Sequence, residues 1–372
     1  MVQSRAAVLW GLNEPWKIED VTIDDPGPGE VLLQTKAAGM CHSDEHAVTG
    51  DMLLPHLPCI GGHEGAAEVL AVGPGVTSVA PGDHVSMSFI PSCGRCKWCV
   101  SGHSNLCDLG AKLFDLGMMT DGRVAHHVGD RDLARMCQLG TFAEHLLVAE
   151  AAVVKVDPDL PWNAVALVSC GVATGYGSAV HRAEVKAGDT VAVIGCGGLG
   201  MNAIQGAALS GARRVIAIDP VEFKREKAME FGATHTFAST EEAIGEIGAL
   251  TWGEMCDKVI LTPGVMKGDM VEPALTITAK GGTCVMTAVA NMLDNEVTMN
   301  PFMFTMLNKE LKGCLFGSGN PRVDIPALLN LYRDGKLKLD ELVTRTYTLD
   351  QVNEGYQDMR DGKNIRGVIT FD

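Results

Sequence analysis

The sequence TVAVIGCGGLG, residues 190–200, places a glycine-rich loop directly after a short apolar run. The run has the β-branched residues of a buried strand, and the apolar residues after the loop predict a helix over Leu199–Ser210. Glycines in this setting allow a tight turn, close approach of the backbone to a pyrophosphate, and close packing of the helix on the strand. The start of the helix offers unpaired N–H groups to phosphates. The residues predicted to bind a dinucleotide here are Gly195, Gly197, Gly198, Leu199 and Gly200.

A carboxylate follows the next predicted strand, Arg214–Asp219. At that place Asp219 can accept a hydrogen bond from a ribose 2′-hydroxyl and repel a 2′-phosphate, so the loop and the acid together favour NAD over NADP. Lys224 could also reach the ribose, or it could stand on a helix surface, and the sequence leaves both open.

Strand and helix patterns alternate from about residue 172 to residue 313, which predicts a parallel sheet with helices on both faces. The preceding part of the chain is different, because short candidate strands separated by Gly–Pro turns indicate a β-rich, partly barrel-like domain. These candidate strands are Ala6–Trp10, Trp16–Ile23, Glu30–Ala38 and Glu68–Val72. We therefore predict an α/β plus β protein whose domains comprise residues 1–171 with 314–372, and residues 172–313.

The composition narrows the class of protein. A net charge of −16 argues against a nucleic-acid partner, because phosphate binding needs a basic face. The N-terminus resembles no signal peptide, and no apolar run is expected to approach the roughly 18 residues that span a membrane. A cytoplasmic location is therefore expected. Twelve cysteines in such a chain indicate metal binding rather than a disulfide scaffold.

Four of these cysteines lie close together, as Cys93, Cys96, Cys99 and Cys107. Four thiolates at this spacing can surround one tetrahedral zinc ion and leave no open position, which is typical of a structural site. The alternative is four free surface thiols, which would be open to oxidation. The remaining cysteines outside the predicted zinc sites are interpreted as core or loop thiols, at positions 59, 137, 196, 256, 284 and 314.

Three further segments carry a resemblance to a known family. GHEGA at residues 62–66, CHSDEH at residues 41–46 and SCGVATG at residues 169–175 are similar to the zinc-ligand segments of zinc-dependent medium-chain alcohol dehydrogenases. With the cysteine cluster and the glycine loop, the resemblance runs over essentially the whole chain. It implies a GroES-like catalytic domain around a Rossmann coenzyme domain, NAD as cofactor, and two zinc ions per subunit, one catalytic and one structural.

The resemblance also implies roles for single residues. Cys41, His63 and Cys170 would hold the catalytic zinc with one position left open, a ligand set that is known for alcohol dehydrogenase. Ser43 would take the alcohol proton, and His46 would pass it through the cofactor ribose to solvent, since an imidazole titrates near neutral pH. The substrate would be a small alcohol or the matching aldehyde.

Supporting residues are implied in the same way. Asp44 would orient the zinc-bound histidine, and Glu64 would lie behind the metal, unless both are ordinary surface carboxylates. His42 and Arg366 would face the pyrophosphate, with a solvated arginine as the alternative for Arg366. Thr174 would lie against the nicotinamide or pack in the core.

Within the family, several segments resemble the nitrosoaniline-dependent nicotinoprotein branch. They are AVLWGL (7–12), CHSDEH (41–46), SFIP (88–91), DPVEFK (219–224) and GSGNPRVD (317–324). This branch implies that NAD stays tightly bound and is reoxidised by a second substrate or an external electron acceptor. The alternatives are a conventional dehydrogenase that exchanges NAD, including the S-(hydroxymethyl)thiol or formaldehyde class, and a redox-inert nucleotide-binding protein. Family members are commonly homo-oligomers.

The segment Leu109–Leu139 is long for a simple connection. We expect a surface loop, with a substrate entrance or a subunit contact as alternatives. The alternative to a surface loop is a pocket, which would be lined by Met118, Met119, His126 and His127.

Overall fold

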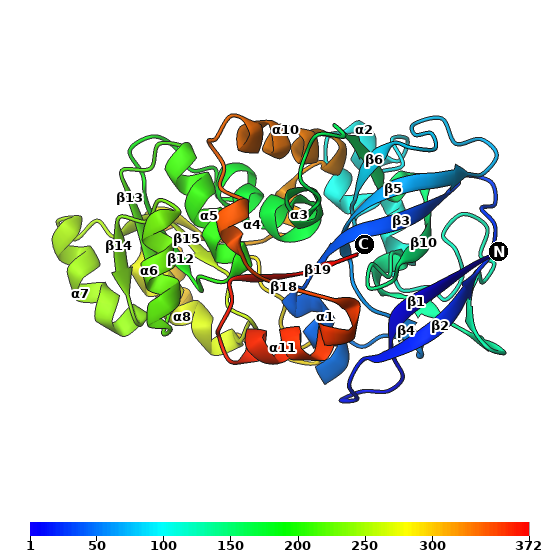
Figure 1. Ribbon diagram of the computed structural model, residues 1–372. Coiled ribbons are helices and arrows are strands. Elements are labelled where there is room, and N and C mark those ends of the chain that lie inside the picture. The colour runs from blue at the N-terminus through cyan, green and yellow to red at the C-terminus, as the bar shows by residue number, and fades with distance from the viewer. Residues whose placement is uncertain (372) are drawn as a thin grey trace. The chain divides into compact units, whose positions relative to one another are not determined.

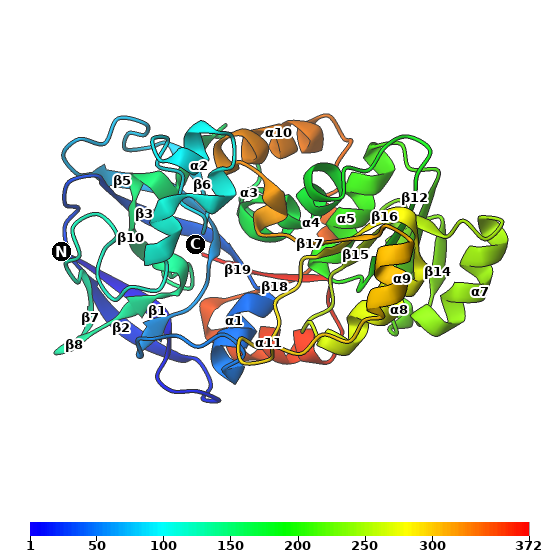
Figure 2. The ribbon, with the colours of Figure 1, turned by 180° about the vertical axis from the view of Figure 1, so that it is seen from behind.

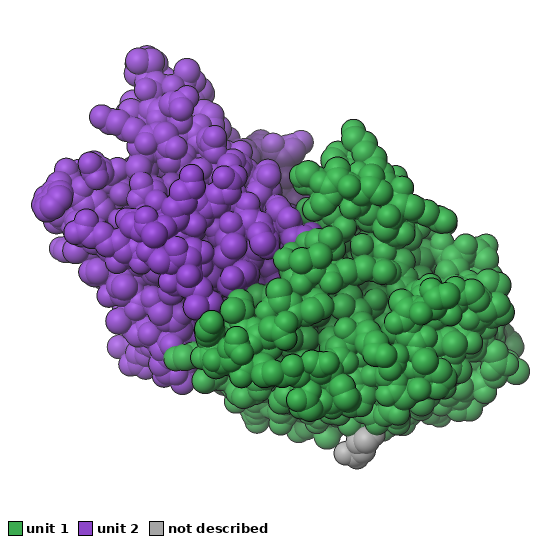
Figure 3. Space-filling model, turned by 90° about the horizontal axis from the view of Figure 1, so that it is seen from above, with its two compact units in different colours: residues 1–170, 320–372 green, residues 171–319 purple. Residues whose placement is uncertain are grey.

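The computed structural model describes residues 1–371. The chain forms two compact units, one of Met1–Cys170 with Asn320–Asp372 and the other of Gly171–Gly319 (Figure 3). The domain ends expected from sequence, at residues 171 and 313, lie one and six residues from the ends of these units at 170 and 319. Figures 1 and 2 show the elements of each unit from opposite sides.

The first unit is β-rich, as the short candidate strands predict, and it is built on two sheets. One has the order β8-β7-β2-β1-β4-β9, and the other has the order β11-β6-β5-β3-β19-β18, with β10 also paired to β3. Their buried faces form an aliphatic core that includes Val31, Leu33 and Val85. The strands of the first sheet are β1 (Val2–Leu9), β2 (Lys17–Ile23), β4 (Cys59–Ile60), β7 (His126–Val128), β8 (Arg131–Asp132) and β9 (Ala134–Arg135). Those of the second sheet are β3 (Glu30–Gly39), β5 (Glu64–Val72), β6 (His84–Met87), β10 (His145–Ala149), β11 (Val153–Val156), β18 (Val343–Tyr347) and β19 (Arg366–Thr370).

The helices of this unit are short except near the C-terminus. They are α1 (His42–Thr49), α2 (Lys97–Val100), α3 (Trp162–Leu167), α10 (Pro321–Arg333) and α11 (Val352–Arg360). Helix α10 begins where the side chain of Asn320 accepts from the backbone N–H of Arg322, and Pro321 occupies the first turn, where a missing N–H costs little.

The second unit has the parallel sheet expected from its alternating pattern. Its strand order is β14-β13-β12-β15-β16-β17 (Figures 1 and 2). The strands are β12 (Thr190–Ile194), β13 (Arg214–Ile218), β14 (His235–Phe237), β15 (Cys256–Leu261), β16 (Thr278–Met286) and β17 (Glu310–Gly313). The helices are α4 (Ala173–Gly177), α5 (Gly198–Leu209), α6 (Glu222–Glu230), α7 (Thr240–Leu250), α8 (Val271–Ile277) and α9 (Pro301–Met306). The predicted fold class, a β-rich domain together with an α/β domain built on a parallel sheet, is confirmed.

One sequence expectation about apolar runs is wrong. The chain is helical without a break over Trp162–Arg182, through α3, a π-turn at Val168–Val172, α4 and a second π-turn at Ser178–Arg182. These 21 residues are long and apolar enough to cross a membrane. In the structure 83% of the apolar window is buried inside the protein, as in a core helix. The sequence shows no unbroken apolar run here, because Ser169, Gly171, Thr174 and Gly175 interrupt the apolar residues.

The segment Leu109–Leu139 is not a surface loop throughout, which corrects the sequence expectation. Met118, Met119 and His126 are buried, and Met118 belongs to the aliphatic core between the sheets. A buried arginine, Arg135, holds the segment by donating to Gly117 O at 3.3 Å. His127 remains half-buried beside Asp132, with 3.0 Å between Nδ1 and Oδ1.

Candidate active site and cofactor loop

Three segments of the first unit bring the predicted catalytic zinc ligands together. Strands β3 and β5 pair antiparallel with Gly39 opposite Glu64, so the residues just beyond β3 and just before β5 are neighbours. Cys41 therefore lies beside His63, and the π-turn at Val168–Val172 supplies Cys170. Ligand atoms of these three residues and of Glu64 lie within 4.8 Å of one another. π-Turns inside helices are frequent at functional sites, and this one carries a ligand.

His63 is oriented for metal binding. Its Nδ1 lies 3.1 Å from Asp44 Oδ1, and the same oxygen accepts from the Gly62 N–H at 3.0 Å. His63 Nε2 is buried and, among residues 1–371, has no hydrogen-bond partner. Burial by itself would lower the pKa of His63, but the charges of Asp44 and Cys41 raise it well above its usual value. A buried, unsatisfied ring nitrogen beside two thiols fits a zinc ion, whose binding would satisfy it.

The two thiols are hydrogen-bonded to each other. The hydrogen bond from Cys170 lowers the pKa of Cys41 well below its usual value, and the same bond, with burial, raises the pKa of Cys170. A thiolate is the form that binds a metal, so the lowered pKa of Cys41 favours metal binding, and Cys170 would release its proton on binding. The donor set therefore fits zinc in its chemistry as well as in its spacing.

Glu64 and Arg366 form a buried ion pair behind this cluster. Glu64 is 0% and Arg366 is 4% exposed, and Arg366 Nη2 donates to the Glu64 carboxylate and, at 3.2 Å, to Met40 O. Burial raises the pKa of Glu64 despite the guanidinium, while the pKa of Arg366, which burial would lower, is raised chiefly by Glu64. The alternatives of a surface carboxylate for Asp44 or Glu64 and a solvated side chain for Arg366 are therefore wrong. The pyrophosphate contact of Arg366 stays a prediction.

The predicted proton-relay residues lie on α1, directly after Cys41. Ser43 Oγ is 3.7 Å from Cys41 Sγ. His46 is 2% exposed, and its Nδ1 lies 3.2 Å from Asp51 Oδ2. Sequence reasoning missed Asp51. Its position five residues after a predicted relay histidine, beyond the helix end at Gly50, was the available signal.

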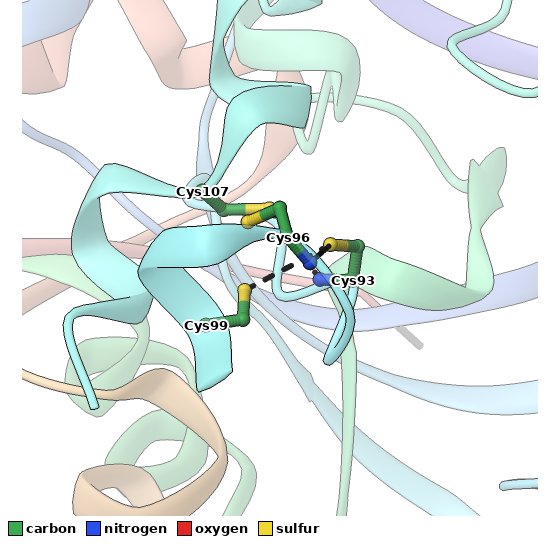
Figure 4. A group of neighbouring side chains, drawn as sticks. All are labelled: Cys93, Cys96, Cys99 and Cys107. Carbon is green, nitrogen blue, oxygen red and sulfur yellow. Dashed lines mark hydrogen bonds between the residues drawn. The ribbon is translucent and has the colours of Figure 1, made fainter. Parts of the chain in front are cut away.

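The four-cysteine cluster forms a second metal-binding group. Figure 4 shows the side chains of the four cysteines gathered between α2 and the flanking loops, and all four sulfurs lie within 4.8 Å of one another. Cys93 and Cys99 sulfurs are 3.9 Å apart, and those of Cys96 and Cys107 are 4.0 Å apart. Backbone hydrogen bonding at Asp108 lowers the pKa of Cys96 to about 6, whereas burial raises that of Cys107 to about 12. Four sulfurs in contact fit one tetrahedral zinc ion.

The glycine loop in the second unit has the backbone geometry expected of a dinucleotide site. Gly195 has φ +94°, and a Cβ there would lie 2.5 Å from Thr262 O. A Cβ on Gly200 would lie 1.9 Å from Gly195 O, so only glycine permits this close packing of helix on loop. Helix α5 begins with a glycine at its N-cap and no side-chain cap, which leaves N–H groups for an anion.

Asp219 is buried at the end of β13, 5% exposed. Its Oδ2 accepts from the Cys196 N–H at 2.8 Å and its Oδ1 from the Val221 N–H at 2.9 Å, which fixes the carboxylate beside the glycine loop. Thr174 is 7% exposed, and its Oγ1 has no hydrogen-bond partner among residues 1–371. Lys224 is half-buried on α6. The contacts of His42, Thr174, Asp219 and Lys224 with a cofactor stay predictions.

The other cysteines are mostly core residues. Burial raises the pKa of the thiols at 137, 256 and 284 to about 12, and it also raises those at 59 and 196. Cys314 is half-buried. Five of the six are therefore inert packing groups, as interpreted from the sequence.

Comparisons with known proteins agree with this site. Residues 27–158 match the family described as the alcohol dehydrogenase GroES-like domain, and residues 198–334 match the family described as zinc-binding dehydrogenase. The chain belongs to the zinc-dependent medium-chain alcohol dehydrogenase family, and it is an oxidoreductase. Zinc and NAD(H) are the cofactors that this family implies, and its substrates are small molecules.

Its relatives are similar over their whole length. An NDMA-dependent alcohol dehydrogenase of Amycolatopsis methanolica is 52% identical over 368 residues, covering 99% of each chain. Alcohol dehydrogenase B of Mycobacterium tuberculosis is 50% identical over 370 residues, covering 100% of this chain and 99% of the relative. The crystal structure of benzyl alcohol dehydrogenase from Acinetobacter calcoaceticus superposes with a TM-score of 0.92 at 27% identity, covering 100% of both chains. The resemblance predicted from the sequence is confirmed.

Proposed function

We propose that this protein oxidises alcohols to aldehydes or ketones, and catalyses the reverse reaction, by hydride transfer between the substrate carbon and NAD. The observation that carries the proposal is the buried, unpaired Nε2 of His63 between the thiols of Cys41 and Cys170. Three protein ligands and an open position are typical of catalytic rather than structural zinc. This argues against the redox-inert nucleotide-binding protein.

Two zinc ions would be held by this chain. Cys41, His63 and Cys170 would hold the catalytic ion, and the cysteines at 93, 96, 99 and 107 would hold the structural one. When bound at the first site, zinc would supply a Lewis acid that favours loss of the alcohol proton. With zinc bound, Asp44 would hold His63 in the tautomer whose Nε2 carries a lone pair, because its carboxylate, 3.1 Å from Nδ1, accepts from Nδ1–H.

The proton would leave through residues of α1. Ser43, next to Cys41 in space, would accept it from the alcohol, and His46 would pass it on. Asp51 accepts from His46 Nδ1–H, so the lone pair of Nε2 is left to receive a proton. The nicotinamide supplies the hydride acceptor, which is the cofactor's own chemistry.

We infer further that NAD remains bound during turnover and is reoxidised in place by a second substrate or an external acceptor. The 52% identity to an NDMA-dependent enzyme over nearly the whole chain supports this reading over a conventional, exchanging dehydrogenase. The cofactor would be bound by the glycine loop and Asp219 of the second unit, with His42, Thr174, Lys224 and Arg366 as further contacts.

The test is to desalt the purified protein, denature it, and quantify the NAD(H) released per subunit. Near-stoichiometric release is expected. A protein that emerges empty and then oxidises alcohol with added NAD would be a conventional dehydrogenase, and retention would be wrong. A protein without zinc and without activity toward any alcohol would contradict the catalytic proposal itself.

We also propose a homo-oligomer in a reducing, cytoplasmic compartment. Strand β17 ends the sheet of the second unit, and the exposed apolar residues Met292, Leu293, Phe302 and Met306 belong to the same unit. An open sheet edge and exposed large apolar side chains suit a second copy. Light scattering of Phe302→Glu and Met306→Lys variants should show a smaller mass than that of the parent protein.

The proposed compartment rests on the cysteines. Twelve free cysteines suit a compartment that keeps metal-binding thiols reduced.

A further inference from the structure

A fully buried hydroxyl connects three segments of the second unit. Ser178 is 0% exposed, and its Oγ donates to Thr174 O at 2.6 Å. It also lies 3.0 Å from Thr287 Oγ1 and 3.6 Å from Cys314 Sγ. A serine hydroxyl has one proton and two lone pairs. Because the proton goes to Thr174 O, the Thr287 hydroxyl and the Cys314 thiol donate to Ser178, and its hydrogen-bonding capacity is fully used.

Two of these partners stand at the carboxyl edge of the parallel sheet. Thr287 directly follows β16, Cys314 directly follows β17, and the last residues of the two strands, Met286 and Gly313, are paired. The Cys314 N–H donates to Met286 O at 2.9 Å, which keeps both strand ends in register. In open α/β sheets ligands bind outside the carboxyl ends of the strands, the same edge from which the glycine loop leaves β12.

The turn after Cys314 is held in an unfavourable backbone conformation. Phe316, Gly317 and Ser318 have φ values of 52°, 62° and 56°. Non-glycine residues are uncommon in this left-handed region and tend to occur there at functional sites. The turn packs on α4 through glycine, since a Cβ on Gly177 would lie 2.5 Å from Gly317 O.

A buried hydroxyl without a hydrogen-bond partner lies at the same place and indicates a ligand site. Thr174, whose carbonyl accepts from Ser178, has a buried Oγ1 without a partner among residues 1–371. A Cβ on Gly317 would lie 3.0 Å from that same Thr174 carbonyl, so the turn and the helix meet there. Buried hydroxyls are normally satisfied, and this one would be satisfied by a polar ligand.

We propose that Ser178 is a positioning residue that fixes Thr174, Thr287 and Cys314 around the nicotinamide end of NAD and slows release of the cofactor. The inference rests on the proposed function, because it takes NAD to be the ligand at this edge. Ser178 itself acts through its three partners. Removal of its hydroxyl takes this acceptor from the Thr287 hydroxyl and leaves Cys314 with its contact to Ser318 Oγ at 3.9 Å, so the two strand ends are no longer joined through one side chain.

The test compares Ser178→Ala and Thr287→Val with two controls. Thr287→Ser keeps the donor to Ser178. Thr278→Val removes an equally buried hydroxyl that donates to Ala274 O at 2.8 Å, but at the first residue of β16, the opposite end of the strand. Each protein is loaded with NADH and desalted, and release is followed by loss of bound-NADH fluorescence after excess NAD is added. Thermal unfolding is measured in parallel.

Ser178→Ala and Thr287→Val should release NADH about tenfold faster than the parent protein, because the first removes the acceptor of the Thr287 hydroxyl and the second removes the donor to Ser178. Thr287→Ser and Thr278→Val should release it at the parent rate, even where Thr278→Val is equally destabilised. Parent-like release from Ser178→Ala, or equal acceleration by Thr278→Val, would overturn the proposal. If Ser178→Ala does not fold, the proposal is tested by the two Thr287 variants: faster release from Thr287→Val but not from Thr287→Ser would support it, and equal release would overturn it.

A parent protein that holds no NAD(H) after desalting would refute cofactor retention but not this role of Ser178. In that case the dissociation constant of added NADH is measured by fluorescence for the same variants. A rise of about tenfold in Ser178→Ala but not in Thr278→Val would support the positioning role. Equal dissociation constants in Ser178→Ala and the parent would refute it.

Discussion

Asp44→Asn is the substitution that most directly tests how the buried histidine is prepared for zinc. One carboxylate oxygen accepts from both His63 Nδ1 and the Gly62 N–H, and the side chain is 0% exposed. Asparagine has the same shape and keeps a carbonyl oxygen there, but it has no charge. Hydrogen bonds to a charged group contribute about 1 kcal/mol more than neutral ones. The hydrogen bond to His63 orients the ring toward the metal site, and the hydrogen bond to Gly62 fixes the backbone just before β5.

We therefore expect zinc binding to weaken by about 1–2 kcal/mol, which is roughly five- to thirtyfold. Competition with a chelator of known affinity, followed by metal analysis, measures this loss. Asp83→Asn is the matched control, because Asp83 also accepts from a backbone N–H, that of Ala80 at 2.9 Å, in the turn before β6. If Asp44→Asn holds zinc as tightly as the parent protein, or if Asp83→Asn weakens it equally, the reasoning is refuted.

Three further expectations follow from individual sites. Cys96→Ser should remove one zinc ion per subunit and lower the free energy of unfolding in urea by on the order of 4 kcal/mol, and an unchanged zinc content would contradict the structural site. Asp219→Asn should improve binding of NADP relative to NAD by about tenfold, since it removes the charge that repels a 2′-phosphate; unchanged relative dissociation constants would show that another group selects the ribose. Burial lowers the pKa of His126, whose Nε2 accepts from the Leu147 N–H at 3.4 Å, so the folded state keeps this ring neutral while the unfolded chain protonates it below about pH 6.5. The contribution of the neutral ring to the free energy of unfolding is present above that pH and is lost as the pH falls. Between about pH 7.5 and about pH 5.5, His126→Gln should therefore lose about 1 kcal/mol less stability than the parent protein. An equal loss in the two proteins would show that His126 is protonated in the folded protein.

Local patterns predicted the glycine loop and the cysteine cluster, because their chemistry depends on residues close together in the chain. Gly195 and Gly200 meet within one turn, and Cys93 and Cys107 are only 14 positions apart in the chain. The element ends were less certain. Strand β5 begins at Glu64 rather than at the expected Glu68, since its pairing with β3 extends to Glu64.

The buried segment that follows the cysteine cluster could not be predicted in this way. Met118 and His126 carry no periodic pattern, and their burial follows from packing between the sheets and from the anchoring of Arg135. A sequence window contains no information about which distant strands will cover it. The length of the segment was compatible with a surface loop, although its apolar side chain Met118 belongs to the core.

The sequence by itself determined the two-domain class, the dinucleotide loop, and a family resemblance that names Cys41, His63 and Cys170 as ligands. Only the tertiary structure decided that these three meet, because the register of β3 with β5 and a π-turn bring them within reach. It also decided that Arg366 pairs with Glu64, and that Ser178 ties the ends of two strands. Such contacts depend on strand register and helix packing, which are set by the burial of the whole chain and not by any local run of residues.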